Sequence, residues 1–594
     1  MVAMYRVGRA RPPSIATVLM RAARLWAWLA VAIVALACSG PMSAPSGDRL
    51  PGADGPPAAP KRLRIGILQE PKGWMPWGGT SSAGGAHQPY WLTTRTLTII
   101  DDGGRIQPVL AESIPSLETG DWRVHSDGTM DQTWRIRPNA KWHDGRPVTV
   151  DDFLLGWEIL VHPGLPTTAV DARDLLAGAS APDPSTLMLH FKGTTPLAEQ
   201  MLFDPYPRHI LGEALANLEP ERFIAHEYWT TSYVAAGPYR LVEWQPGAFL
   251  EFASFAEYVV GKPRIDSITV RFLSDPNTLL ANILSGDVEI ALPDGLSVDM
   301  ARELQRGWAA PEVGNNVVLS FDGRMFRLYF QHRPEYAKPS AARDPRVRRA
   351  FYHTIDKDGV NEVELAGLGR PADSWVPPDD PRLPRFRAAI PEWSYDPNLA
   401  HRILDEAGWQ KGPDGVLVHS PTGQRMETEI RVTPGQGHVK AVAVLADGWR
   451  QVGAAATETI IPTSLLTVGE YRATLPFTGL YGHRIELRWE NQHYGCRRAA
   501  RPENRWTGAH PGYCSAAAEP LIQQLQITIS DEERLSLQVA IMGIVLKEDY
   551  AELPLYWQVT PHAFARGITG LGHLSPGRHG NTWSPWNVHL WDKQ

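Results

Sequence analysis

The sequence predicts an α/β fold with α+β parts, and two observations support this class. Residues 265–272 and 288–291 have strand-like patterns, and between them residues 275–284 begin with a capping Asp and a Pro, as many helices do. This strand–helix–strand order is typical of β-α-β units. Helical and extended patterns mix along the rest of the chain without an internal repeat. The length of 594 residues predicts two to four domains.

The strands and helices can be justified in chain order. Residues 62–68 alternate between polar and apolar types and predict the first strand. Asp144-Gly145 predicts a tight turn, and a helix capped by Thr149 or Asp151 should follow it. Residues 237–255 predict two strands around a turn at 245–248.

Three later helices begin with clear signals. Asp344-Pro345 and Asp396-Pro397 each place a side-chain acceptor before a Pro at the first helical position. We expect the second of these helices to end at Gly408. Ser530 opens a capping box, and that helix should extend to about Lys547.

The N-terminal segment predicts export. Residues 1–37 contain five Arg and no acidic residue, and an apolar run at 25–37 ends directly before Cys38. This pattern is typical of a secretory signal, and the sequence around Cys38 resembles a bacterial lipobox, in which the Cys is lipidated. Ordinary cleavage after Ala37 is the alternative. Residues 39–60, rich in Pro and Gly, predict a linker.

Composition and charge exclude several classes of protein. The whole chain has a formal charge of −7, and removal of the five leader arginines leaves 53 basic against 65 acidic residues. A chain with this balance and without a long basic tract is not a nucleic-acid binder that works by counterion release. Only one apolar run could concern a membrane, which excludes a polytopic membrane protein. The 22 Trp residues indicate either a broad aromatic contact surface or aromatic core packing.

The remaining cysteines predict a disulfide. Cys496 and Cys514 are the only Cys outside the leader, and export would bring them into an oxidising compartment. A zinc site that also used His493 and His510 is the alternative, although two Cys alone are too few ligands.

No motif indicates catalysis. The sequence lacks a nucleotide-binding GxxxxGK[ST] loop, a GxSxG nucleophile elbow and an HExxH zinc motif. Asp151 and Asp152 form an acidic pair, but acids are favourable at any helix N-terminus. We therefore expect no catalytic residue, no metal site and no cofactor.

Several segments in register resemble the peptide-type solute-binding proteins of ABC importers, the oligopeptide- and dipeptide-binding family. The strongest match, residues 133–153, resembles the family's strand, W-x-D-G turn and helix start. The others are 108–113, 344–356, 395–409, 553–557 and 586–591. Together they extend over nearly the whole chain after the leader.

The resemblance implies a two-lobed periplasmic-binding-protein fold of type II with an extra domain in the first lobe. It implies that residues 61–95, 237–320 and 550–594 form lobe I, that 96–236 form the inserted domain and that 321–549 form lobe II. It further implies a lipid-anchored, extracytoplasmic monomer, in the periplasm or on the outer face of the cell membrane. Such a protein closes its lobes on a ligand and delivers it to a membrane permease with cytoplasmic ATPases.

The candidate ligand-binding residues are acids, arginines, aromatics and one amide. Peptide binders of this family have an Asp for the ligand amine where this chain reads residues 480–491, and that Asp is absent. Glu486 or Glu490 could replace it, and Arg484 or Arg488 could bind a carboxylate, although a surface salt bridge is the alternative for each Arg. The aromatic and amide candidates, each weighed against core packing, are Trp74, Trp77, Trp489, Trp506, Phe330 and Gln331.

The function that these observations favour is the capture of peptides or peptide-like solutes for an ABC importer, without covalent chemistry. A binding protein for oligosaccharides, metal chelates or other small solutes is the first alternative. An extracytoplasmic hydrolase, which would need an acid pair or a nucleophile–base pair, is the second. A ligand sensor that signals to a receptor is the third.

Overall fold

The computed structural model describes residues 59–594 apart from 76–84, 102–104, 167–169, 197, 201–202, 293–294, 309–315, 379, 434–437, 467, 486–488, 505 and 572–583. The side chains of 170, 171, 200, 320–322, 463, 484 and 584 are also not described. Pro60–Gln594 form one compact unit. The predicted leader, Cys38 and nearly all of the predicted linker lie outside the described residues. No helix in the described part is long and apolar enough to cross a membrane.

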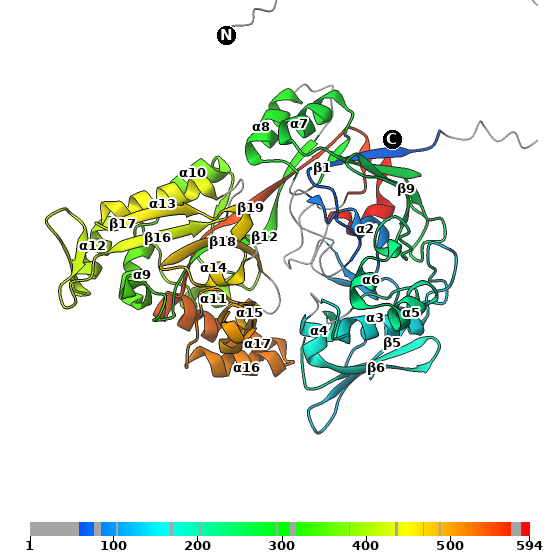
Figure 1. Ribbon diagram of the computed structural model, residues 1–594, viewed down its shortest axis with the longest axis horizontal. Coiled ribbons are helices and arrows are strands. Elements are labelled where there is room, and N and C mark those ends of the chain that lie inside the picture. Colours follow the sequence, from blue (N-terminus) through cyan, green and yellow to red (C-terminus); the bar gives the residue numbers. More distant parts are fainter. Residues whose placement is uncertain are drawn as a thin grey trace, which may run out of the picture. The chain divides into compact units, whose positions relative to one another are not determined.

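An 11-stranded sheet runs through this unit in the order β17-β16-β18-β12-β19-β11-β1-β10-β9-β8, and β13 also pairs with β19 (Figure 1). Its strands are β1 (Arg62–Ile67), β8 (Tyr239–Gln245), β9 (Phe249–Ser254), β10 (Ser267–Phe272), β11 (Ile290–Ala291), β12 (Asn316–Phe330), β13 (Arg370–Pro371), β16 (Glu427–Val432), β17 (Ala455–Ile460), β18 (Thr478–Arg484) and β19 (Glu552–Phe564).

The predicted β-α-β unit is present. β1 is parallel to β10 on one side and to β11 on the other, and helix α7 (Pro276–Ser285) connects β10 to β11. The side chain of Asp275 accepts a hydrogen bond from the backbone N–H of Thr278 at 2.8 Å, as its position before the Pro predicts. These strands and helices confirm the α/β class.

Two long antiparallel strands, β12 and β19, join the two ends of the sheet. β19 pairs with β11 through Phe564 and Ala563, and it pairs with β12 from Phe564 to Glu552. The other edge of β12 pairs with β18, which is parallel to β16. β12 is 15 residues long and β19 is 13. Because of this length, the same two strands contribute to hydrophobic clusters at both ends of the sheet.

A separate 4-stranded sheet has the order β4-β5-β7-β6. Its strands are β4 (Trp122–Val124), β5 (Met130–Arg135), β6 (Leu176–Asp183) and β7 (Thr186–Phe191). Helix α3 (Val150–Val161) shares a hydrophobic cluster with this sheet through Phe153 and Leu160, while its Leu155 and Ile159 belong to the cluster around β1. One helix therefore contributes to both cores, and the predicted division into lobes and an inserted domain stays a prediction.

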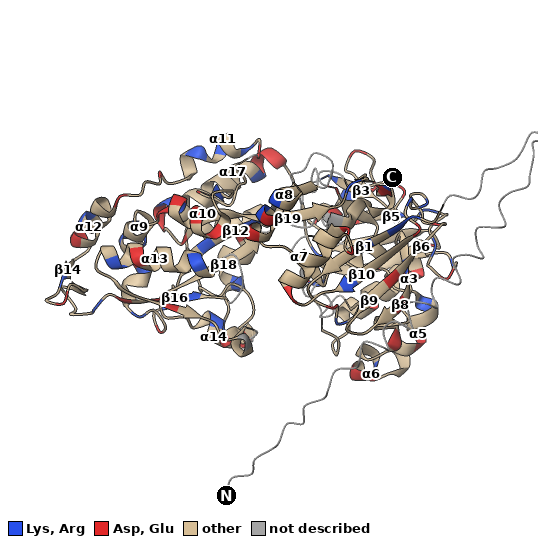
Figure 2. Ribbon diagram, turned by 90° about the horizontal axis from the view of Figure 1, so that it is seen from above, with Lys and Arg blue, Asp and Glu red and all other residues tan. Residues whose placement is uncertain are grey.

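The other elements pack around these sheets. The remaining helices are α2 (Tyr90–Thr93), α4 (Val170–Leu175), α5 (Arg208–Asn217), α6 (Pro220–Ile224), α8 (Val298–Gly307), α9 (Pro345–Tyr352), α10 (Lys357–Leu365), α11 (Leu383–Phe386), α12 (Pro397–Glu406), α13 (Val439–Gln451), α14 (Gly469–Ala473), α15 (Trp489–Tyr494), α16 (Ala518–Ile527) and α17 (Asp531–Met542). Three two-stranded ribbons are formed by β2 (Thr98–Ile100) with β3 (Ile106–Pro108), β14 (Trp409–Lys411) with β15 (Leu417–His419), and β20 (Ile568–Thr569) with β21 (Asp592–Lys593). Acidic and basic residues are distributed over the helices and strands (Figure 2).

The predicted helix starts are confirmed, with two refinements. Asp344, Asp396 and Ser530 each accept a hydrogen bond from the first turn of the helix that follows. At α3 the cap is Thr149, and Asp152 rather than Asp151 completes the capping box, because the third helical residue faces back to the cap. The helix after Ser530 is α-helical only to Met542 and continues as a π-helix, η9 (Gly543–Glu548).

Candidate ligand-binding site

The strand β12 has one apolar and one polar face where it pairs with β18. Phe326, Leu328 and Phe330 point into the largest hydrophobic cluster. The alternate residues Arg327 and Tyr329 lie on the other face, because successive strand residues point to opposite sides. The polar face is therefore the place where this part of the sheet can offer charged and hydrogen-bonding groups.

Arg327 forms a buried ion pair across the two long strands. Its Nε lies 2.5 Å from Oε2 of Glu552, and the two side chains are 4% and 2% exposed. The contact lacks the alignment of a hydrogen bond, so it is a charge–charge contact. Burial raises the pKa of Glu552, and Arg327 opposes that rise.

Helix α15 covers this ion pair with aromatic rings. The guanidinium of Arg327 lies 4.3 Å from the centroid of the Trp489 ring, in cation–π contact. Its Nη2 donates to Nδ1 of His493 at 3.0 Å, and the indole N–H of Trp489 donates to the hydroxyl of Tyr494 at 3.1 Å. A nitrogen that accepts from Arg must carry no proton, so His493 is neutral with its proton on Nε2.

Strand β18 and helix α14 extend the polar face. The His483 ring lies 4.9 Å from the His493 ring, and Tyr481 lies 5.3 Å from Tyr329. Arg472 donates from Nε to the hydroxyl of Tyr481 at 2.8 Å. Burial, reinforced by Arg327, holds the pKa values of His483 and His493 well below the usual range. Both imidazoles are consequently neutral at physiological pH.

Five buried polar atoms on this face have no well-aligned hydrogen-bond partner among the described residues: Arg327 Nε and Nη1, Glu552 Oε1, Tyr329 Oη and His483 Nδ1. Buried polar atoms are normally satisfied by protein, water or a ligand. Two arginines, neutral imidazoles, phenols and an indole together suit a polar or anionic solute with a planar or aromatic part.

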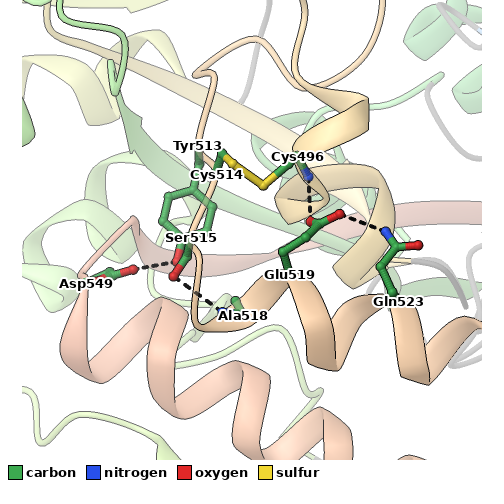
Figure 3. The surroundings of a disulfide bond; sticks show 8 residues. All are labelled: Cys496, Tyr513, Cys514, Ser515, Ala518, Glu519, Gln523 and Asp549. Atoms are coloured by element: carbon green, nitrogen blue, oxygen red, sulfur yellow. Dashed lines mark hydrogen bonds between the residues drawn. A yellow bond between two sulfur atoms is a disulfide. The ribbon is translucent and has the colours of Figure 1, made fainter.

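The disulfide loop is attached to the same region. Cys496 and Cys514 are bonded, which confirms the predicted disulfide and leaves neither thiol for zinc. The backbone N–H of Cys496 donates to Glu519 at 2.7 Å, and the hydroxyl of Tyr513 donates to Asp549 at 2.6 Å (Figure 3). Since His493 precedes Cys496 by three residues, the disulfide restrains the end of α15.

Gln331 and Arg333, which follow β12, also restrain this loop. Both N–H groups of the Gln331 side chain donate to backbone oxygens, those of Ala473 and Leu475. Arg333 donates from Nη1 to the backbone oxygens of Ala473 and His510 at 2.8 and 3.0 Å, and from Nη2 to that of Ala500. Both amide N–H groups of Gln331 are therefore used within the protein, and they could donate to a ligand only if these hydrogen bonds broke.

The other candidates predicted from sequence are distributed as follows. Trp74 is 1% exposed, stacks on Tyr233 at 4.9 Å and belongs to the core around β1. Phe330 is fully buried beside Phe477.

Glu490 is buried and accepts a hydrogen bond from Gln538 at 3.0 Å, and burial raises its pKa. Trp506 is partly buried, in a left-handed conformation with φ 61, and its ring lies 6.2 Å from Tyr336.

Four predicted residues cannot be placed in this way. Trp77, Glu486 and Arg488 lie outside the described residues, and of Arg484 only the backbone, at the end of β18, is described. Among the candidates whose side chains are described, Trp489 alone contacts the Arg327–Glu552 pair directly. Ligand binding by every candidate stays a prediction.

Sequence reasoning did not include Arg327, Glu552 or His483 among the ligand-binding candidates, and it considered His493 only as a possible zinc ligand. A signal was present, because a single Arg in the apolar run 325–330 and a single Glu directly before the apolar run 553–557 both indicate a buried charge. Nothing in the sequence shows that these two charges pair.

Comparison with known proteins assigns the family. The model of the bacterial extracellular solute-binding proteins, family 5 Middle, matches residues 105–475. The chain belongs to this family of solute-binding proteins. The assignment confirms the resemblance that the sequence motifs carry, and members of family 5 are extracellular by description.

Family 5 relatives include proteins described as peptide-binding. A putative ABC transporter peptide-binding protein of Brucella ovis is 27% identical over 329 residues, which are 54% of this chain and 56% of the relative. The oligopeptide-binding protein AppA of Bacillus subtilis is 23% identical over 430 residues, 70% of this chain and 72% of AppA. In the alignment with the Brucella protein, this chain spans little more than half the length of that relative.

Solved structures of the family share the fold. An oligopeptide-binding protein from Thermus thermophilus, complexed with a pentapeptide, has a TM-score of 0.70 at 21% identity, with 90% of this chain and 96% of that chain covered. NikZ from Campylobacter jejuni, in complex with Ni(L-His), has a TM-score of 0.70 at 19% identity, with 90% and 100% covered. These likenesses support the two-lobed fold that the resemblance implies.

Proposed function

We propose that this family 5 protein is the solute-binding component of an ABC importer, and that it captures peptides or peptide-like solutes and delivers them to a membrane permease with cytoplasmic ATPases. Capture would occur by closure of two lobes joined by β12 and β19, with the lobe boundaries that the sequence predicts. Lipidation of Cys38 would hold the monomeric protein in the periplasm or at the outer face of the membrane. Transport in this form needs neither covalent chemistry nor a cofactor.

The observation that carries the proposal is the polar face around Arg327 and Trp489. A buried arginine such as Arg327, beside aromatic rings and neutral imidazoles, is costly for stability, and a binding site supplies a reason for its presence. A peptide carboxylate could pair with Arg327 or Arg472, whose guanidinium groups lie on this face beside aromatic rings.

A non-peptide solute is the second candidate. The Asp that binds the ligand amine in peptide binders of the family is absent from residues 480–491, and one solved relative was crystallised with a nickel–histidine complex. Neutral histidines such as His483 and His493 suit a metal chelate as well as an aromatic solute.

The test is mass spectrometry of molecules that co-purify with the exported protein. The protein is analysed under native conditions and after denaturation, beside a Trp489→Leu variant and a Trp393→Leu control. A mixed set of short peptides released from the wild type and the control, but not from Trp489→Leu, supports the peptide proposal. One discrete non-peptide mass supports the second candidate. Absence of any released molecule, together with no thermal shift from a peptide library or from Ni(L-His), would contradict both.

A further inference from the structure

The solvent-facing side of the 4-stranded sheet has a hydrogen-bonded row of four side chains that the transport function does not use. His125 Nε2 lies 2.9 Å from Asp131 Oδ2, and Asp131 Oδ1 lies 2.7 Å from His190 Nδ1. His190 Nε2 lies 2.7 Å from the hydroxyl oxygen of Ser180. The row crosses all four strands, because these residues lie on or directly after β4, β5, β7 and β6 in their spatial order.

The register of the strands explains why these side chains meet. Asp131 of β5 lies directly opposite His190 of β7. Gly178 of β6 lies opposite His190 on the other side, and Ser180 is two residues further along the same strand. The alternate residues Gln132, Trp134 and Leu189 are fully buried beneath the sheet. The row is thus on the outer face, where the side chains of His190 and Asp131 are 37% and 26% exposed.

The charge of Asp131 determines where the protons lie. Hydrogen bonds from the two histidines lower the pKa of Asp131 despite its partial burial, so it is a carboxylate at neutral pH. A carboxylate can only accept hydrogen bonds, so His190 must donate from Nδ1. When His190 is neutral, its Nε2 then has a lone pair, and Ser180 must donate its proton to it. This is the orientation in which an imidazole acts as a general base toward a hydroxyl.

The surroundings of Ser180 permit a reagent to approach. Ser180 is partly exposed and lies on β6, the edge strand of the sheet. Two register shifts between β6 and β7, at 176–178 and 180–183, flank it. An edge strand leaves backbone N–H groups that are not paired within the sheet, and such groups can stabilise an oxyanion. Packing between the strands would by itself require neither an ionised Asp131 nor a hydrogen bond donated by Ser180 to His190.

We propose that Ser180, His190 and Asp131 form a second site on this protein, at which Ser180 is a nucleophile toward small activated esters and related acyl or phosphonyl electrophiles. The Ser180 oxygen forms a bond to the carbonyl carbon while its proton moves to His190 Nε2. The bond to the leaving alcohol then breaks, and that alcohol takes the proton from His190. Water repeats both steps, which releases the carboxylic acid and restores Ser180. Asp131 is a positioning residue that holds the His190 tautomer, and His125 holds Asp131.

The test uses a biotin-linked alkyl fluorophosphonate, which forms an O–P bond to an activated Ser and releases fluoride. The full chain is treated with the probe, digested, and the adducts are located and timed by peptide mass spectrometry. Ser185 is the internal control, because it lies in the same hairpin but bonds to Asp183 instead of a His. We expect labelling of Ser180 about 10²-fold faster than of Ser185, which is the lower end of the gain from a positioned general base.

Variants separate activation from a structural role. His190→Gln and Asp131→Asn should each reduce the labelling rate of Ser180 to that of Ser185, while thermal unfolding monitored by circular dichroism verifies that the sheet is intact. Arg123→Gln, on the same outer face but outside the row, should label as the wild type does. Hydrolysis of p-nitrophenyl acetate should be lost in Ser180→Ala. The proposal is overturned if wild-type Ser180 reacts no faster than Ser185, or if a folded His190→Gln variant keeps the wild-type labelling rate.

Discussion

The guanidinium of Arg327 lies 4.3 Å from the centroid of the Trp489 ring, and the same guanidinium contacts Glu552. One side chain of β12 therefore connects β19 to α15, the helix that begins within residues 480–491, the segment compared above with the amine-binding segment of peptide binders. A ligand that bound at α15 would therefore lie one side chain away from the two strands that join both ends of the sheet.

The Arg327–Glu552 pair should be strongly coupled. Arg327→Met leaves a buried carboxylate without its partner, so we expect a loss of about 3–5 kcal/mol in the free energy of unfolding. The double variant Arg327→Met with Glu552→Gln should recover most of that loss, because neither charge then remains buried. Urea unfolding of the wild type, both single variants and the double variant measures this coupling. Additive effects of the two substitutions would show that the charges do not stabilise one another.

The disulfide should contribute measurably to stability. Cys496 and Cys514 are 18 residues apart. Loss of a disulfide that closes a loop of this size is expected to lower the free energy of unfolding by about 3 kcal/mol in the chain-entropy description. Cys496→Ser with Cys514→Ser should lower the melting temperature, and reductant should lower that of the wild type but not that of the variant. Equal melting temperatures with and without reductant, in a protein shown by mass to be reduced, would contradict this expectation.

Arg333 should control the order of the disulfide loop. Arg333→Ala removes donors to three backbone oxygens, so amide hydrogen exchange within residues 496–514 should become faster. Arg343→Ala is the matched control, since Arg343 donates to the backbone oxygen of His332 outside the loop. Acceleration of similar size in both variants would mean that Arg333 has no special role there.

Acid should destabilise the protein through its buried histidines. Burial lowers the pKa of His143 to about 4, of His589 to about 4 and of His510 to about 3. In the unfolded chain these imidazoles titrate near pH 6.5, so between pH 6.5 and about 4 the unfolded state binds more protons than the folded state. Stability should therefore fall as the pH falls through this window. The urea midpoint from pH 8 to pH 4 measures it, and His510→Gln should flatten the dependence.

Cys38 should determine attachment to the membrane. Cys38→Ser should prevent the incorporation of radiolabelled palmitate and move the exported protein into the soluble fraction, whereas Ser39→Ala should not. If Cys38→Ser remained in the membrane fraction, the lipobox interpretation would be wrong and the alternative, cleavage after Ala37, would not suffice either.

Local features of the sequence predicted the parts of the fold that depend on neighbours in the chain. Asp275, Asp344 and Asp396 cap helices because a side-chain oxygen reaches a backbone N–H two or three residues away, in almost any surroundings. The prediction for the helix after Ser530 is less accurate at its C-terminal end. No cap or helix-breaking residue marks the change from α-helix to π-helix at Gly543. Gln331 and Trp74 were recognisable as polar or aromatic residues near strand ends, but their hydrogen bonds and stacking partners are distant in sequence.

By itself, the sequence determined the α/β class, the family, the strand–helix–strand unit and the pairing of Cys496 with Cys514. The class, the strand–helix–strand unit and the disulfide follow from spacing, caps or a count of residues, whereas the family follows from the resemblance of several segments in register. Only the tertiary structure decided that Arg327 meets Glu552 and that Ser180 meets His190 and Asp131. The physical reason is that strand register, set by long-range hydrogen bonding and burial, brings together side chains whose separation along the chain is unrelated to their distance in space.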